Sequence, residues 1–343
     1  MPVTERPVVV TGASGFVGSA IVRELLDHGY RVRGTVRSPD RVRSEGHLTA
    51  LPGSDRLDLI AADLNQPGSF DPAMDGVEHV IHAASPYVVS VDDPQRDLVD
   101  PALNGTLSVL ESAAAAGRVR RIVVTSSFAA VTDEPAGRFD ETIWNDSSSL
   151  RRNPYYYAKT VAERAAWAFA ASHPAIRVVV INPTLVIGTS LVPALNESNG
   201  VLAGYTTRQY PGILSLCYGL VDVRDVAKAH RLALETDAAS GRYLCTAGVW
   251  SMRQIVEVAR TSDLNLARLP SIPLDNTVGT FLVKAAAALQ HPGARSYLRT
   301  NIGREFEIDT SKIKAELGMS FRPVEEAILD TYRDLRRWGH ITA

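Results

Sequence analysis

A tyrosine and a lysine four residues apart are the residues of this 343-residue chain whose types and spacing best suit chemistry. They lie in the segment 153–159, which reads NPYYYAK, at the start of a helix predicted over Pro154–Ser172. Helical residues four apart share one face, and an ammonium beside a phenol favours the phenolate, which lowers the tyrosine pKa. Tyr155 would then donate a proton near neutral pH. The alternative is structural: Tyr155 packs in the core while Lys159 forms a surface ion pair with Glu163.

A glycine-rich turn near the N-terminus is typical of a dinucleotide site. A run of valines ends at Thr11, and GASGFVG at 12–18 then leads into an apolar pattern of helical spacing. In such a strand–turn–helix unit Gly12 allows the tight turn, Gly15 lets a pyrophosphate approach the helix N-terminus, and Gly18 lets the helix pack on the strand. The alternative is a turn that needs glycine only for its conformation. We expect the dinucleotide to contact Gly12, Ser14, Gly15, Phe16, Val17 and Gly18.

The end of the next predicted strand, Tyr30–Arg37, indicates which dinucleotide is bound. An acidic residue there would bind the adenosine ribose of NAD, whereas a cation accommodates the extra phosphate of NADP. The chain has Arg37 and Arg41, and Asp40 is the only acid nearby. The alternative is a solvated basic loop. The sequence therefore predicts NADP(H), bound by Arg37 and Arg41.

Further strand ends supply the rest of the expected site. Strands are predicted at 56–62, 77–83, 121–125 and 177–181, and the carboxyl ends of parallel strands share the ligand-binding edge of an open α/β sheet. The fifth strand delivers Ser126 and Ser127 to this edge. Asp63 would reach the adenine amino group, or would only cap the following segment. The remaining cofactor contacts are expected from Asp63, Leu64, Ala83, Ala84, Ser85, Pro183 and Val186.

Strand and helix alternate from Pro7 to Ile181, which predicts an α/β fold with a doubly wound parallel Rossmann sheet. We expect residues 1–183 to form the dinucleotide-binding domain, with the chain returning to it around 213–247. Residues 184–343 would form a smaller α/β substrate-binding domain, helical around 252–261 and 324–338 and irregular between. The segment 133–153 shows no convincing element, and its length suggests the hypothesis that it folds over substrate.

The composition excludes some classes of binding partner and indicates the cellular compartment. A net charge of -2 and a pI of about 6.5 give no electrostatic support for nucleic acid or an anionic membrane as partner. Two cysteines, Cys217 and Cys245, and the lack of a long apolar run favour a reducing, cytoplasmic location. His79 and His82 are three apart in a predicted strand, so their side chains would face opposite ways, and we expect no metal site. The sequence leaves open whether the chain is a monomer or a homodimer.

In order and spacing these motifs resemble the extended short-chain dehydrogenase/reductase family. The resemblance spans nearly the whole chain and is closest to the branch of dihydroflavonol reductases, cinnamoyl-CoA reductases and microbial aldehyde/ketone reductases. The segment 153–159 shares four positions with the cinnamoyl-CoA reductase signature Asn-Trp-Tyr-Cys-Tyr-Gly-Lys and differs at the other three. The motifs that carry the resemblance are TGASGFVG at 11–18, TVR at 35–37, DL at 63–64, HAASP at 82–86, TSS at 125–127, Tyr155 with Lys159, and NPT at 182–184.

The resemblance implies the roles of three residues. Ser127 would hydrogen-bond a substrate carbonyl oxygen, with Ser126 as the competing candidate. Tyr155 would protonate that oxygen, and Lys159 would lower the tyrosine pKa and bind the nicotinamide ribose. The implied reaction is reversible, NADPH-dependent reduction of an aldehyde or ketone to an alcohol.

Substrate contacts are less determined by the sequence. Sugar-nucleotide dehydratases of the wider family have an Asp-Glu pair where Phe128 and Ala129 stand here, and an apolar wall suits a carbonyl compound better than a sugar. Tyr205 and Tyr218 line the pocket or pack in the core. Two alternative functions are an NAD-dependent nucleotide-sugar epimerase and a non-catalytic NADP-sensing regulator. We expect the small-molecule substrate to contact Ser85, Tyr87, Phe128 and Tyr156.

Overall fold

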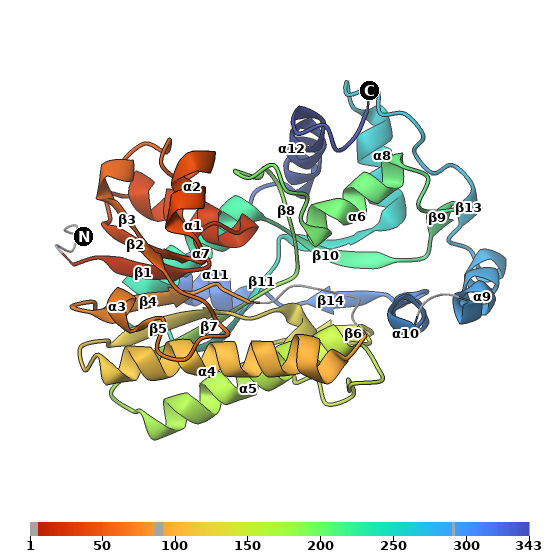
Figure 1. Ribbon diagram of the computed structural model, residues 1–343. Coiled ribbons are helices and arrows are strands. Elements are labelled where there is room, and N and C mark those ends of the chain that lie inside the picture. The colour runs from red at the N-terminus through yellow and green to blue at the C-terminus, as the bar shows by residue number, and fades with distance from the viewer. Residues whose placement is uncertain (1–5, 86–91, 290–291, 343) are drawn as a thin grey trace.

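A seven-stranded parallel sheet forms the centre of the larger lobe (Figure 1). The computed structural model describes residues 6–85, 92–289 and 292–342. The strand order is β11-β7-β5-β4-β1-β2-β3, so the predicted doubly wound α/β fold is confirmed. The strands are β1 (Val8–Thr11), β2 (Val32–Val36), β3 (Leu57–Ala61), β4 (His79–His82), β5 (Arg121–Thr125), β7 (Arg177–Pro183) and β11 (Gly241–Cys245).

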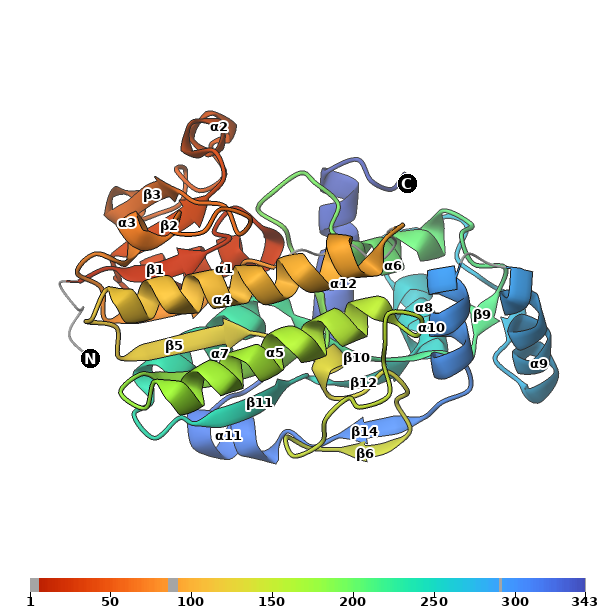
Figure 2. The ribbon, with the colours of Figure 1, turned by 60° about the horizontal axis from the view of Figure 1, so that its bottom comes forward.

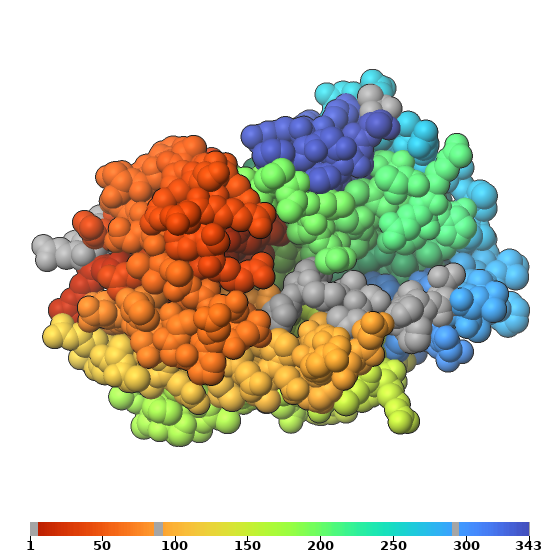
Figure 3. All heavy atoms as spheres, viewed as in Figure 1, coloured from red at the N-terminus to blue at the C-terminus, as the bar shows by residue number. Residues whose placement is uncertain are grey.

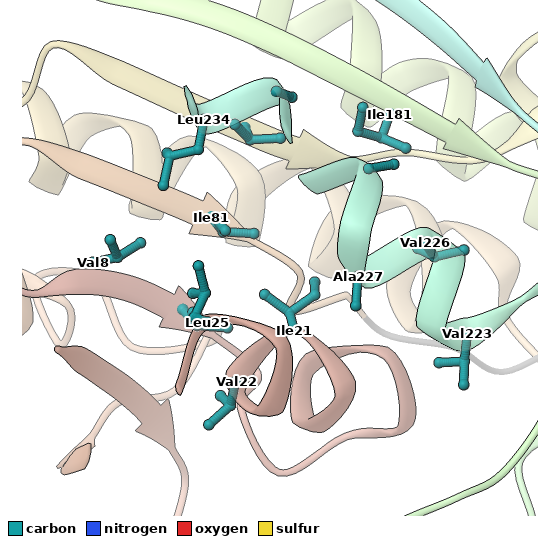
Figure 4. Close-up of a cluster of buried hydrophobic side chains, with 14 of the residues drawn as sticks. Val8, Ile21, Val22, Leu25, Ile81, Ile181, Val223, Val226, Ala227 and Leu234 are labelled. Carbon is teal, nitrogen blue, oxygen red and sulfur yellow. The ribbon is translucent and has the colours of Figure 1, made fainter. Parts of the chain in front are cut away.

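Helices cover both faces of this sheet because its valine-rich strands are buried on both sides. On one face, Ile21 and Leu25 of α1 and Val226 of α7 point toward the strands (Figure 4). On the other face α4 and α5 run side by side (Figure 2). The helices of the lobe are α1 (Phe16–Asp27), α2 (Pro39–Glu45), α3 (Asp71–Met74), α4 (Asp100–Ala115), α5 (Pro154–Ser172), α7 (Val223–Glu235) and α11 (Ser311–Leu317).

The order of the strands fixes where a ligand can bind. From β1 the chain moves outward through β2 to β3, and it then returns to place β4 on the other side of β1. The helices that follow β1 and β4, α1 and α4, therefore lie on opposite faces of the sheet, and in open α/β sheets ligands bind at the carboxyl edge where this reversal occurs. The glycine turn at 12–18 and the residues that follow β4 lie at this switch point.

The second lobe has its own core and holds most of the C-terminal half of the chain. In the space-filling view, N-terminal residues occupy the left of the molecule and C-terminal residues the right (Figure 3). Its core packs α6, α8 and α12 on a three-stranded sheet. Its elements are β8 (Leu185–Ile187), α6 (Glu197–Thr206), β9 (Ile213–Leu214), β10 (Cys217–Asp222), β12 (Gly248–Ser251), α8 (Met252–Thr261), β13 (Pro273–Leu274), α9 (Thr277–Ala286), α10 (Pro292–Asn301) and α12 (Val324–Arg337).

The expectation of irregular chain between 261 and 324 is wrong, because α9, α10 and α11 form there. Helices α9 and α10 have ten residues each, and α11 has seven. Prolines and glycines interrupt the apolar pattern in this part of the sequence, so the pattern alone did not indicate these helices. Within the described residues no helix is both long and apolar enough to cross a bilayer.

The segment 133–153 is anchored at several points. Its strand β6 (Gly137–Phe139) pairs in parallel with β14 (Phe306–Ile308). Asn145 Nδ2 donates to Ala129 O over 2.8 Å, and the Trp144 ring lies 4.1 Å from the Arg242 guanidinium carbon. The Asn145 bond holds the segment against the turn that follows β5, and the other two contacts hold it against β14 and β11. The hypothesis that the segment folds over substrate stays untested.

Candidate functional site

Two glycines of the turn after β1 cannot carry a side chain. Gly12 has φ +66°, and a Cβ there would lie 2.8 Å from Ala84 Cα. A Cβ on Gly18 would lie 2.1 Å from Gly12 O, so α1 approaches the turn as closely as backbone allows. Both distances are shorter than real Cβ contacts, so both positions need glycine for packing, and Gly12 needs it for its backbone conformation as well.

Gly15 is different because it leaves a helix end open. It is the N-cap of α1, it has φ -80°, and no side chain caps the helix there. The first turn contains no acidic residue. The free N–H groups and the helix dipole of such an end attract a phosphate. Ser14 is half-buried and Gly15 is exposed beside it, so this end fits the pyrophosphate of a dinucleotide.

The structure distinguishes the arginines that follow β2. Arg41 Nε donates to Glu45 Oε1 over 2.7 Å, and Arg43 Nη1 donates to Asp40 Oδ1 over 2.9 Å. Arg37 is exposed, directly after the strand, and no group among the described residues bonds to its guanidinium. Arg37 is therefore the cation best placed to meet an additional phosphate, while Arg41 is engaged on α2.

Asp63 and Leu64 lie just beyond β3. Asn65 N donates to Asp63 Oδ1 over 2.9 Å, so the capping interpretation holds for one carboxylate oxygen. Leu64 packs toward α4, where a Cβ on Gly105 would lie 3.0 Å from it. Their contacts with a cofactor stay predictions.

Ser126 and Ser127 face different surroundings at the end of β5. Ser126 is buried and its hydroxyl donates to Glu163 Oε2. Ser127 is half-buried, its Oγ accepts from Ala129 N over 3.1 Å, and its carbonyl accepts from Asn182 Nδ2 over 3.2 Å. The Ser126 hydroxyl is therefore occupied by a hydrogen bond in the protein interior. Of the two candidates, Ser127 is the one whose hydroxyl can contact a ligand.

The surface ion pair between Lys159 and Glu163 does not form. The Glu163 carboxylate is buried, with Arg242 Nε 2.6 Å from Oε1 and Asn182 Nδ2 donating to Oε2 over 2.7 Å. Within the part of the chain that the structure describes, Lys159 has no ion-pair partner. Instead its Nζ donates to Ser85 Oγ over 2.8 Å, which joins α5 to the residues that follow β4.

Burial changes the acidity of Lys159. The side chain is 9% exposed, and this desolvation lowers its pKa to about 8, against the opposing effect of the Glu163 carboxylate. Near neutral pH the ammonium is still the major form. Its Nζ lies 5.8 Å from the centre of the Tyr155 ring. Helix α5 begins at Pro154 as predicted, and it contacts the short helical turn η3 (Phe128–Ala130) that follows Ser127.

A buried histidine joins the two strand ends at the switch point. His82 Nδ1 lies 2.8 Å from Thr11 Oγ1, and Ala84 N donates to the same hydroxyl oxygen over 3.1 Å. Burial, with a smaller contribution from the Lys159 charge, lowers the pKa of His82 to about 3. His82 is thus a neutral structural residue that fixes Ala83 and Ala84 beside the glycine turn.

The residues expected to bind substrate have varied surroundings. The ring of Tyr156 lies edge-on to that of Tyr155, 6.0 Å between centres. Phe128 packs in an aromatic cluster 5.6 Å from Phe139 and 6.0 Å from Phe306. Tyr87, like Pro86, lies outside the described residues.

Four further residues named from the sequence are largely enclosed. Tyr205 and Tyr218 are 0% and 8% exposed and belong to the core of the second lobe, as the alternative interpretation held. Pro183 ends β7, and Val186 is buried in β8 against the main core. Contacts of Pro183 and Val186 with a cofactor stay predictions.

Sequence reasoning missed the polar residues that support this region. Asp133, Asn182 and Arg242 are buried, and their partners come from distant parts of the chain. No local pattern could have indicated these pairings. Signals existed at Asn153, which opens the segment that carries Tyr155 and Lys159, and at Asn182, which opens the motif NPT.

Residues 8–245 match the NAD dependent epimerase/dehydratase family, more than half of the chain. The chain belongs to this family. Its relatives include cinnamoyl-CoA reductase 1 of Arabidopsis thaliana, with 38% identity over 98% of this chain and 91% of that protein. Tetraketide alpha-pyrone reductase 1 of the same plant has 35% identity over 98% of this chain and 97% of that protein.

A solved structure extends the comparison to three dimensions. Yeast methylglyoxal/isovaleraldehyde reductase Gre2, complexed with NADPH, superposes with a TM-score of 0.79 at 25% identity, covering 98% of this chain and 100% of that one. The resemblance to reductases of the extended short-chain dehydrogenase/reductase type is therefore confirmed. This member of the family is an oxidoreductase of that reductase branch.

Proposed function

We propose that this protein is an NADPH-dependent carbonyl reductase that reversibly converts an aldehyde or ketone to an alcohol. The observation that carries the proposal is the buried Lys159 ammonium, one helical turn from Tyr155 and hydrogen-bonded to Ser85 at the ligand-binding edge. Burying an ammonium that has no ion pair within the described residues costs free energy. A lysine in such a position is therefore a candidate for a functional role of its charge.

The cofactor would be held by the glycine turn and by Arg37. The open N-terminus of α1 suits the pyrophosphate, and the unengaged Arg37 guanidinium suits the phosphate that distinguishes NADPH from NADH. When bound, the nicotinamide supplies the hydride. The solved yeast relative was crystallised with NADPH, which supports the same choice.

Ser127 would orient the substrate. Its Oγ accepts the Ala129 N–H, so the lone pair facing the protein is occupied and the hydroxyl proton is available to a substrate carbonyl oxygen. A donor aimed at an oxygen that gains negative charge during reduction stabilises the transition state more than the ground state.

Tyr155 would supply the proton that completes the alcohol. The Lys159 charge favours loss of the phenolic proton, and Lys159 is held in place by Ser85. Positioned general acids of this kind contribute about 10²- to 10⁴-fold in rate. In the reverse direction the same phenolate would accept the alcohol proton.

The proposed substrates are aldehydes and ketones that are not sugar nucleotides. Phe128 and Ala129 place an apolar side chain and a methyl group beside Ser127, and Phe128 is held in its aromatic cluster. The names of the relatives, which are reductases of cinnamoyl-CoA, tetraketide pyrone and methylglyoxal, support carbonyl substrates as a class.

The test is a screen of NADPH oxidation, followed by absorbance, across aldehydes, diketones, ketoesters, flavanones and acyl-CoA thioesters. We expect turnover with at least one class and a preference for NADPH over NADH. Clear NADPH binding without oxidation on any substrate would favour a sensor instead. A preference for NAD together with epimerisation of a nucleotide-sugar would favour the epimerase.

A further inference from the structure

Helix α5 starts from a residue in a backbone conformation that residues other than glycine rarely adopt. Asn153 is its N-cap and has φ 50° and ψ 61°, in the left-handed region. Asparagine tolerates this region better than most residues, but the conformation still requires support from its surroundings. Asn153 is 5% exposed, so that support comes from the protein interior.

Hydrogen bonds from Asn153 reach two other segments. Its Nδ2 donates to Asp133 Oδ2 and to Thr300 Oγ1, each over 3.0 Å, and its backbone N donates to Ser296 Oγ over 3.1 Å. Its carbonyl accepts from Tyr156 N over 2.9 Å within the first turn of α5. One buried side chain therefore ties the start of α5 both to the turn after β5 and to α10 of the second lobe.

Asp133 is the charged hydrogen-bond acceptor of Asn153, and its own contacts fix its position. Its side chain is fully buried, Arg152 Nε donates to Oδ2 over 2.8 Å, and Ser147 Oγ donates to Oδ1 over 2.5 Å. Burial alone would raise the pKa of the Asp133 carboxyl, but the hydrogen bonds from Arg152, Ser147 and Asn153 together lower it. The carboxylate therefore stays ionised near neutral pH and accepts the hydrogen bond from Asn153 Nδ2.

We propose that Asn153 is a positioning residue that sets the orientation of Tyr155 and couples it to α10. Tyr155 follows two residues later, so the direction in which the chain enters α5 decides where its phenol points. This inference rests on the proposed function, because a change in orientation affects rate only if Tyr155 is the proton donor. A misplacement of about 1 Å at a reacting group costs about 100-fold in rate.

Three substitutions at Asn153 separate conformation from hydrogen bonding. Asn153→Gly keeps the left-handed backbone accessible but removes the bonds to Asp133 and Thr300. Asn153→Ala disfavours the left-handed backbone conformation and also removes the hydrogen bonds to Asp133 and Thr300. Asn153→Asp places a second carboxylate against Asp133, and protonation of this pair at lower pH would restore a hydrogen bond between them.

We expect kcat to fall about 100-fold in Asn153→Ala and about 10-fold in Asn153→Gly, with the Kd for NADPH unchanged in both. The kcat of Asn153→Asp should recover as the pH is lowered, which a merely structural role would not produce. The matched control is Asn265→Ala, because Asn265 also has a positive φ, 49°, but is exposed and remote in sequence from these elements. That control should keep the kcat of the unmodified protein.

A second readout does not depend on turnover. With 3-fluorotyrosine placed at position 155, the ¹⁹F resonance should shift in Asn153→Ala and stay in place in Asn265→Ala. An unmoved resonance in folded Asn153→Ala, or an unchanged kcat, would overturn the proposal. If the unmodified protein reduces no carbonyl, the proposed function fails, and the resonance still decides the positioning role.

A milder variant covers the case in which Asn153→Ala does not fold. Thr300→Val removes one acceptor of Asn153 Nδ2 from α10 and leaves α5 itself intact. We expect a fall of about 3- to 10-fold in kcat and a smaller shift of the resonance at position 155, in line with the loss of one hydrogen bond. If Thr300→Val changed neither kcat nor the resonance at position 155, that result would contradict the coupling to α10.

Discussion

Replacing Arg37 by alanine should weaken NADPH binding and leave NADH binding nearly unchanged. Arg37 follows β2 at the ligand-binding edge, is exposed, and has no bonded partner among the described residues. Its guanidinium is therefore free to contact the phosphate that only NADPH carries. NADH has a ribose hydroxyl at that position and would not need the cation.

The size of the effect follows from the bond that is lost. A hydrogen bond to a charged group contributes about 1.5–3 kcal/mol, and about 1.4 kcal/mol corresponds to tenfold in affinity. Loss of Arg37 should therefore raise the Kd for NADPH about 10- to 150-fold, nearer the lower value because the side chain is exposed and screened by solvent. The ratio of NADPH to NADH affinity should fall by the same factor.

The assay is a titration of cofactor fluorescence at low and high salt, with Arg41→Ala as the matched control. Arg41 is bonded to Glu45 on α2, so its loss should change the Kd for NADPH about threefold or less. Equal losses in the two variants would show that the basic cluster acts collectively. An unchanged Kd in Arg37→Ala would refute the assignment of NADPH specificity to this residue.

Three further predictions concern the glycine turn, Lys159 and one buried histidine. Gly18→Ala would place a methyl carbon 2.1 Å from Gly12 O, so we expect a loss of about 1–3 kcal/mol in unfolding free energy and weaker cofactor binding, whereas Gly200→Ala, where the nearest atom to the new Cβ is Leu195 Cδ2 at 4.0 Å, should be neutral in urea unfolding. The pKa of Lys159 is lowered to about 8, so the ammonium is lost as pH rises through that value, and kcat/KM for reduction should fall above about pH 8; a flat profile to pH 10 would contradict this. Burial lowers the pKa of His230 to about 4 while the unfolded imidazole titrates near 6.5, so its contribution to stability, about 3 kcal/mol, should be lost as pH drops between these values; His230→Asn should reduce the pH dependence of unfolding by that amount, while the contribution of buried His82 remains.

Local patterns were sufficient to predict the elements that carry the site. The strand at Arg121–Thr125 and the helix at Pro154–Ser172 have the predicted bounds, because a β-branched run and a proline at the first helical position are signals contained within each element. Alternation of such elements determined the fold class. The observed β2 and β4 are one or two residues shorter at each end than the sequence predicted, because local patterns locate the end of a strand less precisely than its centre.

Interactions between distant segments could not be predicted from the sequence. Glu163 lies one turn after Lys159, and helical spacing alone favoured an ion pair between them. In the folded protein it is buried against Arg242, 79 positions away in the sequence, because β11 returns to the sheet beside β7. The contact of Asn153 with Thr300 spans an even longer stretch of chain. Such pairs follow from topology, which local periodicity does not determine.

The choice between Ser126 and Ser127 shows the same limit. Alternation along a strand places successive side chains on opposite faces, but it does not say which face is the ligand side. The hydrogen bond of Ser126 to buried Glu163 supplies that information.

The most direct test of the central claim is single-turnover oxidation of NADPH by Tyr155→Phe, on a substrate identified with the unmodified protein. This variant removes one oxygen atom and keeps the ring that packs beside Tyr156. We predict that the rate of the chemical step falls at least about 100-fold while the Kd for NADPH changes less than about twofold. A rate like that of the unmodified protein would contradict the assignment of Tyr155 as proton donor.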